Sequence, residues 1–110
     1  MKTLNEISDA VYMNAKEKGF HPDQSQQIFI AEQINNLHSE VSELWDAHRA
    51  GNFFEPCDKD IGLNCADEEY ADIVIRALDQ CRALGIDIQR AIEVKHAYNL
   101  TRPFKHGKKN

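Results

Sequence analysis

The feature that most constrains the fold is the segment 25–50, which contains neither glycine nor proline. Its apolar side chains recur at the three- and four-residue spacing of one helix face, in a row that comprises Ile30, Ile34, Leu37, Val41, Leu44 and His48. Gly51 follows at the position where helices commonly end in left-handed backbone. A long helix with one apolar row needs other elements to cover it, so the segment predicts a helical packing partner.

Three further segments have the same helical periodicity, about residues 4–18, 67–84 and 88–100. Gly19 and Gly85 follow the first two of them, Asp87 is a suitable N-cap for the last, and Pro103 prevents its easy continuation. We find no convincing strand pattern. We therefore expect an all-α fold that resembles a four-helix bundle, formed by a single domain over residues 1–110.

The segment between the second and third predicted helices, residues 51–66, has no periodicity and contains two glycines and a proline. We expect a loop there. A connection of this length exceeds what a structural link usually needs, which suggests a functional or mobile role. Phe53 and Phe54 could anchor this loop on its own chain or insert into the core of a partner subunit.

The composition indicates a water-soluble domain. No apolar run approaches the roughly 18 residues that a membrane helix needs, and the N-terminus lacks the apolar stretch of a signal peptide. We expect a cytoplasmic protein without a membrane partner. The three cysteines are an odd number without CxxC spacing, so free thiols are more plausible than disulfides or a zinc site built from His48, Cys57 and Cys65.

Charge is distributed unevenly along the chain, whose net charge is −5. Residues 95–110 contain five basic and no acidic residues, and they include the irregular basic tail predicted at about 102–110. All 18 acidic residues lie in the preceding part. An acidic body argues against a duplex nucleic acid partner, which would need a broad basic face. It suits a small polyanion held between a metal ion and several cations.

Two pairs of acidic residues stand out within the predicted helices, Glu40 with Glu43 and Glu69 with Asp72. Residues three apart on a helix lie on one face with Cβ atoms about 5–6 Å apart, where like charges repel. Both pairs border an apolar row, and apolar or small residues follow Glu40, Glu43 and Glu69 four positions later, where lysines would form ion pairs. They predict either a nest of four carboxylates or a set of solvated surface acids.

A nest of four carboxylates would favour a hard divalent cation. Magnesium takes oxygen ligands and commonly bridges protein carboxylates to substrate phosphates. An iron or manganese carboxylate site would instead call for ExxH motifs on paired helices, and neither Glu40 nor Glu69 has histidine three residues later. Oxygen-only ligation therefore predicts Mg²⁺, with Mn²⁺ as a substitute.

The C-terminal segment contributes Lys95, Asn99 and Arg102, spaced as K-x-x-x-N-x-x-R-P. Lysine suits a phosphate as a point charge, and arginine binds two non-bridging oxygens at once. Each residue also has a structural interpretation. Lys95 could lie along the apolar seam of its helix, and Asn99 and Arg102 could serve the helix end.

The two acid pairs and this C-terminal spacing together resemble the ExxE…ExxD signature and the ending of the MazG-like, all-α nucleoside triphosphate pyrophosphatases. The similarity covers about residues 28–108, with 25 residues between Glu43 and Glu69. It implies a magnesium-dependent enzyme that hydrolyses a (deoxy)nucleoside triphosphate to a monophosphate and pyrophosphate. Members of that family are dimers or tetramers in which helices of two subunits shape each site, so we expect a homodimer or homotetramer.

The resemblance also implies roles for individual residues. The four acids of the two pairs would hold Mg²⁺, and Lys95 and Asn99 match positions that contact phosphate and sugar. Arg76 stands where related dCTP-type enzymes often have an aromatic residue, which makes it a candidate substrate-binding residue and leaves the base specificity open. Glu43 is our candidate proton acceptor, because a carboxylate not fully engaged as a ligand can take a proton from water.

A rival hypothesis is a non-catalytic helical module, in which the acid pairs bind a cation structurally or border an oligomer interface. The sequence leaves several further alternatives open. The base and sugar of the substrate are not specified, and water could attack the α or the β phosphorus. The protein could be a dimer or a tetramer. Its biological role could be sanitation of the nucleotide pool or hydrolysis of a signalling nucleotide.

Overall fold

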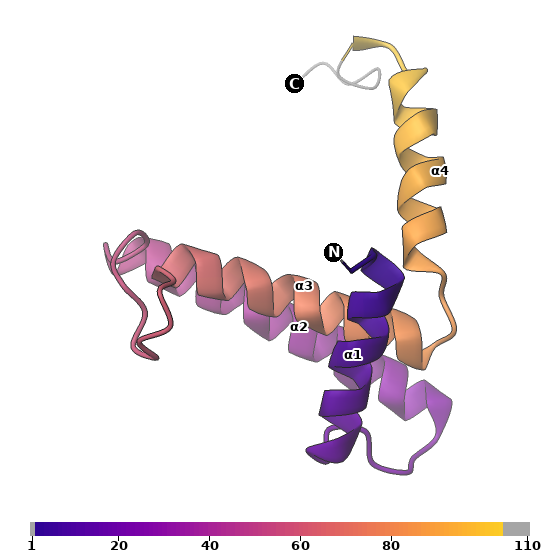
Figure 1. The fold of residues 1–110 in the computed structure, drawn as a ribbon, viewed down its shortest axis with the longest axis horizontal. Coiled ribbons are helices and arrows are strands. Elements are labelled where there is room, and N and C mark those ends of the chain that lie inside the picture. The colour runs from indigo at the N-terminus through magenta and orange to yellow at the C-terminus, as the bar shows by residue number, and fades with distance from the viewer. Residues whose placement is uncertain (1, 105–110) are drawn as a thin grey trace.

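The computed structural model describes residues 2–104, and these form four helices joined by loops (Figure 1). The helices are α1 (Leu4–Glu17), α2 (Gln26–Arg49), α3 (Cys65–Ala83) and α4 (Ile88–Leu100). The all-α prediction is confirmed, and most helix ends fall within one or two residues of the predicted positions. Within residues 2–104, no helix combines the length and apolar character needed to cross a membrane.

Each helix begins at a side chain that accepts a hydrogen bond from a backbone N–H of the first turn, and these N-caps are Thr3, Ser25, Asn64 and Asp87. In α3 the N-cap is reciprocal, because Asn64 accepts from the N–H of Asp67 while Asp67 accepts from the N–H of Asn64. This pair starts α3 at Cys65, two residues before the predicted start at Asp67.

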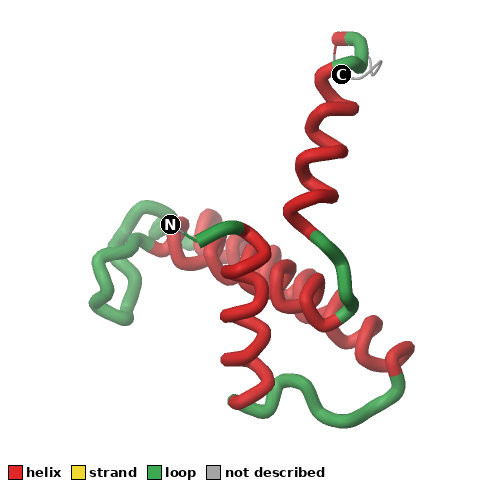
Figure 2. Tube along the Cα trace, turned by 45° about the vertical axis from the view of Figure 1, so that its right-hand side comes forward, coloured by secondary structure: helices red, strands yellow, loops and turns green. Residues whose placement is uncertain are grey.

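Three of the helices pack together, and the fourth does not. Helices α2 and α3 lie side by side and antiparallel, α1 crosses them, and α4 extends away from the group (Figures 1 and 2). No residue of α4 is buried. After α3, Gly85 adopts a φ of 73°, and the chain then turns α4 outward. The predicted four-helix bundle therefore does not close within one chain.

The packed helices bury few apolar side chains. Among the described residues only two apolar ones are buried, Ala66 and Leu78. The predicted apolar row of α2 is half exposed, with Ile34 and Val41 each at 49% exposure, and the neighbouring Trp45 is at 58%. Such an apolar surface is large for a monomeric protein of this size.

Hydrogen bonds between buried residues provide much of the contact between the helices. The Ser8 hydroxyl donates to the carbonyl of Leu78 at 2.5 Å, and the Gln80 amide donates to the carbonyl of Gln33 at 2.9 Å. All four residues are buried. Because a buried polar group without a partner is costly, these bonds fix how α1 and α2 sit on α3.

A histidine–aspartate contact ties the α1–α2 loop to α3. His21 Nε2 lies 2.6 Å from Asp79 Oδ1, and the two side chains are 8% and 3% exposed. The imidazole also lies between the rings of Tyr12 and Phe29, with centroids 5.1 and 5.2 Å away. The contact joins residues 58 positions apart, and no spacing pattern in the sequence predicts it.

We predict that Asp79→Ala lowers the free energy of unfolding by about 1–3 kcal/mol, because it leaves a buried imidazole nitrogen without a partner. Urea denaturation followed by circular dichroism measures the change. The matched control is Asp9→Ala, which removes the exposed partner of Arg82 and should cost less than about 1 kcal/mol. Equal losses in the two variants would contradict a structural role for the buried contact.

Candidate metal centre

Three of the four predicted metal ligands converge between α2 and α3. Glu40 and Glu43 project from α2 and Glu69 from α3, and each offers a carboxylate oxygen within 4.8 Å of the others. Because the two helices pair antiparallel, the two acid motifs lie at the same height along the helix pair. We call these three residues the acid nest.

Several carboxylate oxygens of this region have no partner. Oε2 of Glu40 and Oε2 of Glu69 are buried, and neither makes a hydrogen bond with the described residues. Buried polar atoms are nearly always satisfied in folded proteins, so two orphaned carboxylate oxygens in one cluster are unusual. Oxygen ligands on two helices are the donor set that Mg²⁺ accepts, and the acid nest therefore fits this ion.

The electrostatics of the acid nest point the same way. A hydrogen bond with Glu40, which requires a shared proton, raises the pKa of Glu43, and burial and the charges of Glu40, Glu69 and Asp72 raise it further. Burial, followed by the neighbouring acids, raises the pKa values of Glu69 and Asp72. A raised pKa means that the ionised carboxylate is disfavoured at each of these three positions.

Asp72 lies beside the acid nest without joining it. Its oxygen is not among those within 4.8 Å of one another, although its charge acts on Glu43 and Glu69. Asp72 lines a hollow of about 440 Å³ together with Glu40, Glu43 and residues of α1, which we call the α1-side hollow. Of the four residues predicted as metal ligands, three converge and Asp72 lies beside them; their role as ligands stays a prediction.

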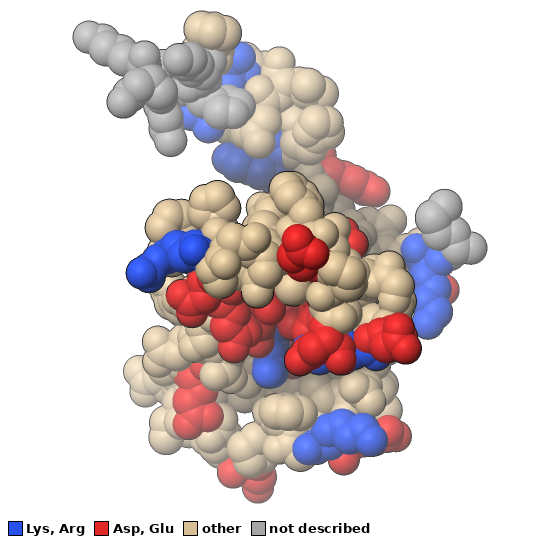
Figure 3. Space-filling model, turned by 90° about the vertical axis from the view of Figure 1, so that its left-hand side faces the viewer, with Lys and Arg blue, Asp and Glu red and all other residues tan. Residues whose placement is uncertain are grey.

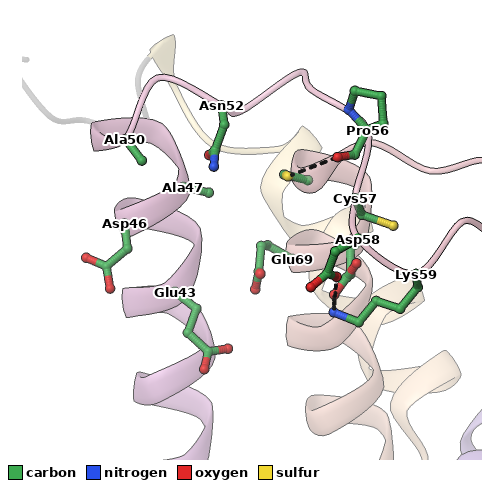
Figure 4. Close-up of a pocket in the computed structure, with 12 residues that line it drawn as sticks. Glu43, Asp46, Ala47, Ala50, Asn52, Pro56, Cys57, Asp58, Lys59 and Glu69 are labelled. Atoms are coloured by element: carbon green, nitrogen blue, oxygen red, sulfur yellow. Dashed lines mark hydrogen bonds and ion pairs between the residues drawn. The ribbon is translucent and has the colours of Figure 1, made fainter.

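A second hollow, of about 580 Å³, opens on the other side of the acid nest, and we call it the loop-side hollow. Glu43 and Glu69 reach into it from the two helices, and the loop after α2 forms its far wall (Figure 4). Lys59 extends from this loop toward α3, where its Nζ lies 2.5 Å from Glu68 Oε1 and 2.9 Å from Asp58 Oδ1. Acidic side chains gather across this end of the molecule (Figure 3).

Arg76 reaches the acid nest from the α1 side. Its Nε lies 3.3 Å from Glu40 Oε1, and its guanidinium group lies 5.2 Å from the centre of the Phe20 ring. Both Arg76 and Phe20 line the α1-side hollow. The structure therefore places Arg76 next to the predicted metal ligands, as the substrate-binding prediction requires.

The other predicted substrate-binding residues lie elsewhere in the single chain. Lys95, Asn99 and Arg102 are on or just after α4, and none of them lines either hollow. Lys95 and Arg102 instead lie near the ring of Tyr98, at 4.9 and 5.8 Å from its centre. The α3–α4 connection is at the end of the α2–α3 pair opposite the loop, which keeps α4 away from the loop-side hollow (Figure 1).

Some sequence predictions concern other parts of the chain. The basic tail predicted at about 102–110 is described only through residue 104, so Lys105, Lys108 and Lys109 lie outside the described residues. Cys57 and Cys65 are free thiols that line the loop-side hollow. No zinc cluster with His48 forms among the described residues.

Sequence reasoning missed Lys59 as a residue of the site. The length of the 51–66 loop did suggest a functional role, but no spacing pattern links position 59 to the acids of α2 and α3. Lys59 is the single basic residue of that loop, and this is the only sequence signal that could have drawn attention to it.

No protein-family model matches this chain, and no match was found among curated proteins or among solved structures.

We predict that Glu43→Gln stabilises the metal-free protein at pH 7.5 by about 0.5 kcal/mol, the scale of like-charge repulsion on helices. The folded state raises the pKa of Glu43, so its ionised form is penalised on folding at high pH. The penalty is absent once the group is protonated in both states, below its ordinary value of 4.5. The advantage of the variant should therefore shrink as the pH falls toward 4.5.

Urea denaturation with a chelator present measures this difference at the two pH values. Adding Mg²⁺ at pH 7.5 should stabilise the wild type more than the variant, because a ligand that binds only the folded state stabilises it. A variant that is less stable than the wild type at pH 7.5 without metal would contradict the repulsion within the acid nest.

Proposed function

We propose that this protein is a magnesium-dependent nucleoside triphosphate pyrophosphohydrolase of the MazG-like type. It hydrolyses a (deoxy)nucleoside triphosphate to the monophosphate and pyrophosphate. The observation that carries the proposal is the convergence of Glu40, Glu43 and Glu69, with two orphaned buried oxygens, between two hollows. An acid nest with a hollow on either side can hold a cation and leave room for a nucleotide.

The carboxylates of the acid nest would repel the phosphates of a substrate unless a bound metal ion neutralised part of their negative charge. A bound Mg²⁺ would supply the positive charge that a phosphoanhydride needs to be attacked. Glu40 and Glu69, with their unpaired oxygens, are the ligands we assign to it, with Glu43 and Asp72 as further acids within reach. Mn²⁺ is expected to substitute.

Glu43 is the proposed proton acceptor. A water molecule attacks the α or the β phosphorus, its oxygen forms the new P–O bond, and its proton passes to the Glu43 carboxylate. The bond between the attacked phosphorus and the oxygen that bridges the α and β phosphorus atoms breaks, which releases the nucleoside monophosphate and pyrophosphate.

The proposed enzyme works as a homo-oligomer. Ile34, Val41 and Trp45 lie along one stripe of α2, about half exposed, and α4 has no buried residue. A second copy would cover such surfaces, as subunit interfaces do in most homo-oligomers. It would also allow Lys95 and Arg102, which lie away from the acid nest of their own chain, to serve the site of another copy.

The proposal predicts pyrophosphate release from at least one nucleoside triphosphate in the presence of Mg²⁺, and none with a chelator. Glu43→Gln should lower kcat at least about 100-fold, the scale of losing a positioned proton acceptor. A panel of dNTPs, NTPs and modified nucleotides, with pyrophosphate as the readout, measures both effects. Glu17→Gln, which alters an exposed acid at the end of α1, is the matched control and should retain full activity.

Two results would count against this assignment. Absence of pyrophosphate with every nucleotide of the panel would favour the non-catalytic helical module instead. Full turnover by Glu43→Gln would leave the enzyme proposal in place and remove Glu43 from its role as proton acceptor.

We predict a solution mass of two or four chains by light scattering. Val41→Glu should shift the protein toward the monomer, because it buries a charge in the proposed interface. Asn36→Glu adds the same charge to an exposed polar position of α2 and should leave the mass unchanged. A wild-type protein that is monomeric at micromolar concentration would refute the oligomer.

A further inference from the structure

The loop that carries Lys59 is tied closely to the helices it joins. Backbone N–H groups of Cys65 and Ala66 donate to the carbonyls of Glu55 and Phe53, each at 2.8 Å, at the start of α3. Farther out, Pro56 and Asn64 form an antiparallel bridge, and the N–H of Cys57 donates to Leu63 at 2.9 Å. Lys59 is thus near the tip of a short hairpin whose base is fixed.

Aromatic side chains hold the same loop from the other side. The Phe53 ring lies 5.8 Å from His48 of α2 and 6.5 Å from Tyr70 of α3, centre to centre. The loop therefore contacts both helices that carry the acid nest. Its position relative to the nest is set by packing as well as by hydrogen bonds, which confirms the prediction that Phe53 could anchor the loop on its own chain.

Lys59 points back over the loop-side hollow. Its ammonium group contacts Glu68 and Asp58, while 57% of its side chain remains exposed. Glu68 is only 16% exposed, and its second oxygen is buried without a partner among the described residues. The acid is therefore fixed in the wall, whereas the lysine is held at the surface of the hollow with donors available to a ligand.

The composition of the loop-side hollow makes this lysine distinctive. Five of the residues that line it are acids, and Lys59 is the one Lys or Arg among them. A phosphate chain cannot approach such a wall unless cations neutralise it. A metal ion on the acid nest would supply one source of positive charge, and among the described residues that line this hollow Lys59 is the only Lys or Arg.

The two hollows differ in the polarity of their lining, and this difference indicates which end of a nucleotide each hollow would bind. The α1-side hollow is lined by apolar side chains such as Val11, Phe20 and Ile75. Its arginine, Arg76, and Lys59 of the other hollow are both paired with acids, but the Arg76 side chain is 27% exposed and that of Lys59 is 57% exposed. A nucleobase suits an apolar, aromatic wall, whereas phosphates suit a polar hollow with an accessible ammonium group. The phosphate end therefore fits the loop-side hollow better.

We propose that Lys59 binds the phosphate chain of the substrate in the loop-side hollow, on the far side of the acid nest from the base. This inference rests on the proposed function, since it deepens the description of the same site. Asp58 and Glu68 position the ammonium group before the substrate arrives, and the phosphate oxygens then take over one or more of its three donors. Lys59 is a binding residue and takes no part in proton transfer.

The test compares Lys59→Met with the wild type at saturating Mg²⁺. We expect KM for the preferred nucleotide to rise about 10–100-fold, the scale of a charge-assisted hydrogen bond, with a smaller change in kcat. Lys59→Arg should recover most of the loss, because it restores the charge. Lys16→Met removes an exposed lysine from the last turn of α1 and should leave KM unchanged.

Calorimetric binding of inorganic pyrophosphate in the presence of Mg²⁺ gives a second readout that does not need turnover. We expect Lys59→Met to weaken this binding by a similar factor. The double variant Lys59→Met/Glu68→Gln separates charge loss from disturbance of the wall. If the double variant regained wild-type KM, the released Glu68 would be the cause and the phosphate contact would be refuted.

The outcomes distinguish the two proposals. Turnover by the wild type with an unchanged KM in Lys59→Met would keep the proposed function and overturn the role of Lys59. Pyrophosphate binding that depends on Lys59, in a protein without turnover, would support the phosphate contact and overturn the enzyme. A wild type that neither hydrolyses nucleotides nor binds pyrophosphate would overturn both.

Discussion

Repulsion between carboxylates on two adjacent helices is the constraint on which the rest of the structure depends. The antiparallel pairing of α2 and α3 sets oxygens of Glu40, Glu43 and Glu69 within 4.8 Å of one another. The pKa of Glu43 is raised first by its hydrogen bond with Glu40 and that of Glu69 first by burial, and the charges of neighbouring acids raise both further. The arginine nearby, Arg76, contacts only one of the three, through Glu40. This repulsion between the two longest helices is the basis on which we propose a divalent cation there.

The scarcity of buried apolar residues is the second constraint, and it concerns assembly. Ala66 and Leu78 are a very small core for helices of this length, and hydrogen bonds such as Ser8 to Leu78 carry much of the contact between helices. The stripe of α2 is about half exposed, and α4 contacts α1 near its first turn while none of its residues is buried. The proposed oligomer accounts for both, and it gives the basic residues of α4 a site to serve.

The sequence predicts the helices well because apolar spacing and N-cap residues are local signals. The meeting of the two acid motifs was also predictable, since both border the apolar rows of neighbouring helices. Three features were not. The direction of α4 depends on the backbone at Gly85, the His21–Asp79 contact joins residues 58 positions apart, and Lys59 reaches its site through a loop without periodicity. Each depends on long-range packing that no spacing rule contains.

The most direct test of the central claim is an anomalous diffraction measurement on crystals of the protein soaked with Mn²⁺, which replaces Mg²⁺ at oxygen sites. The account predicts an anomalous difference peak in the acid nest, at direct coordination distance from oxygens of Glu40 and Glu69, the two ligands assigned to the ion. A peak that appears only elsewhere, or none at a Mn²⁺ concentration of several millimolar, would contradict it.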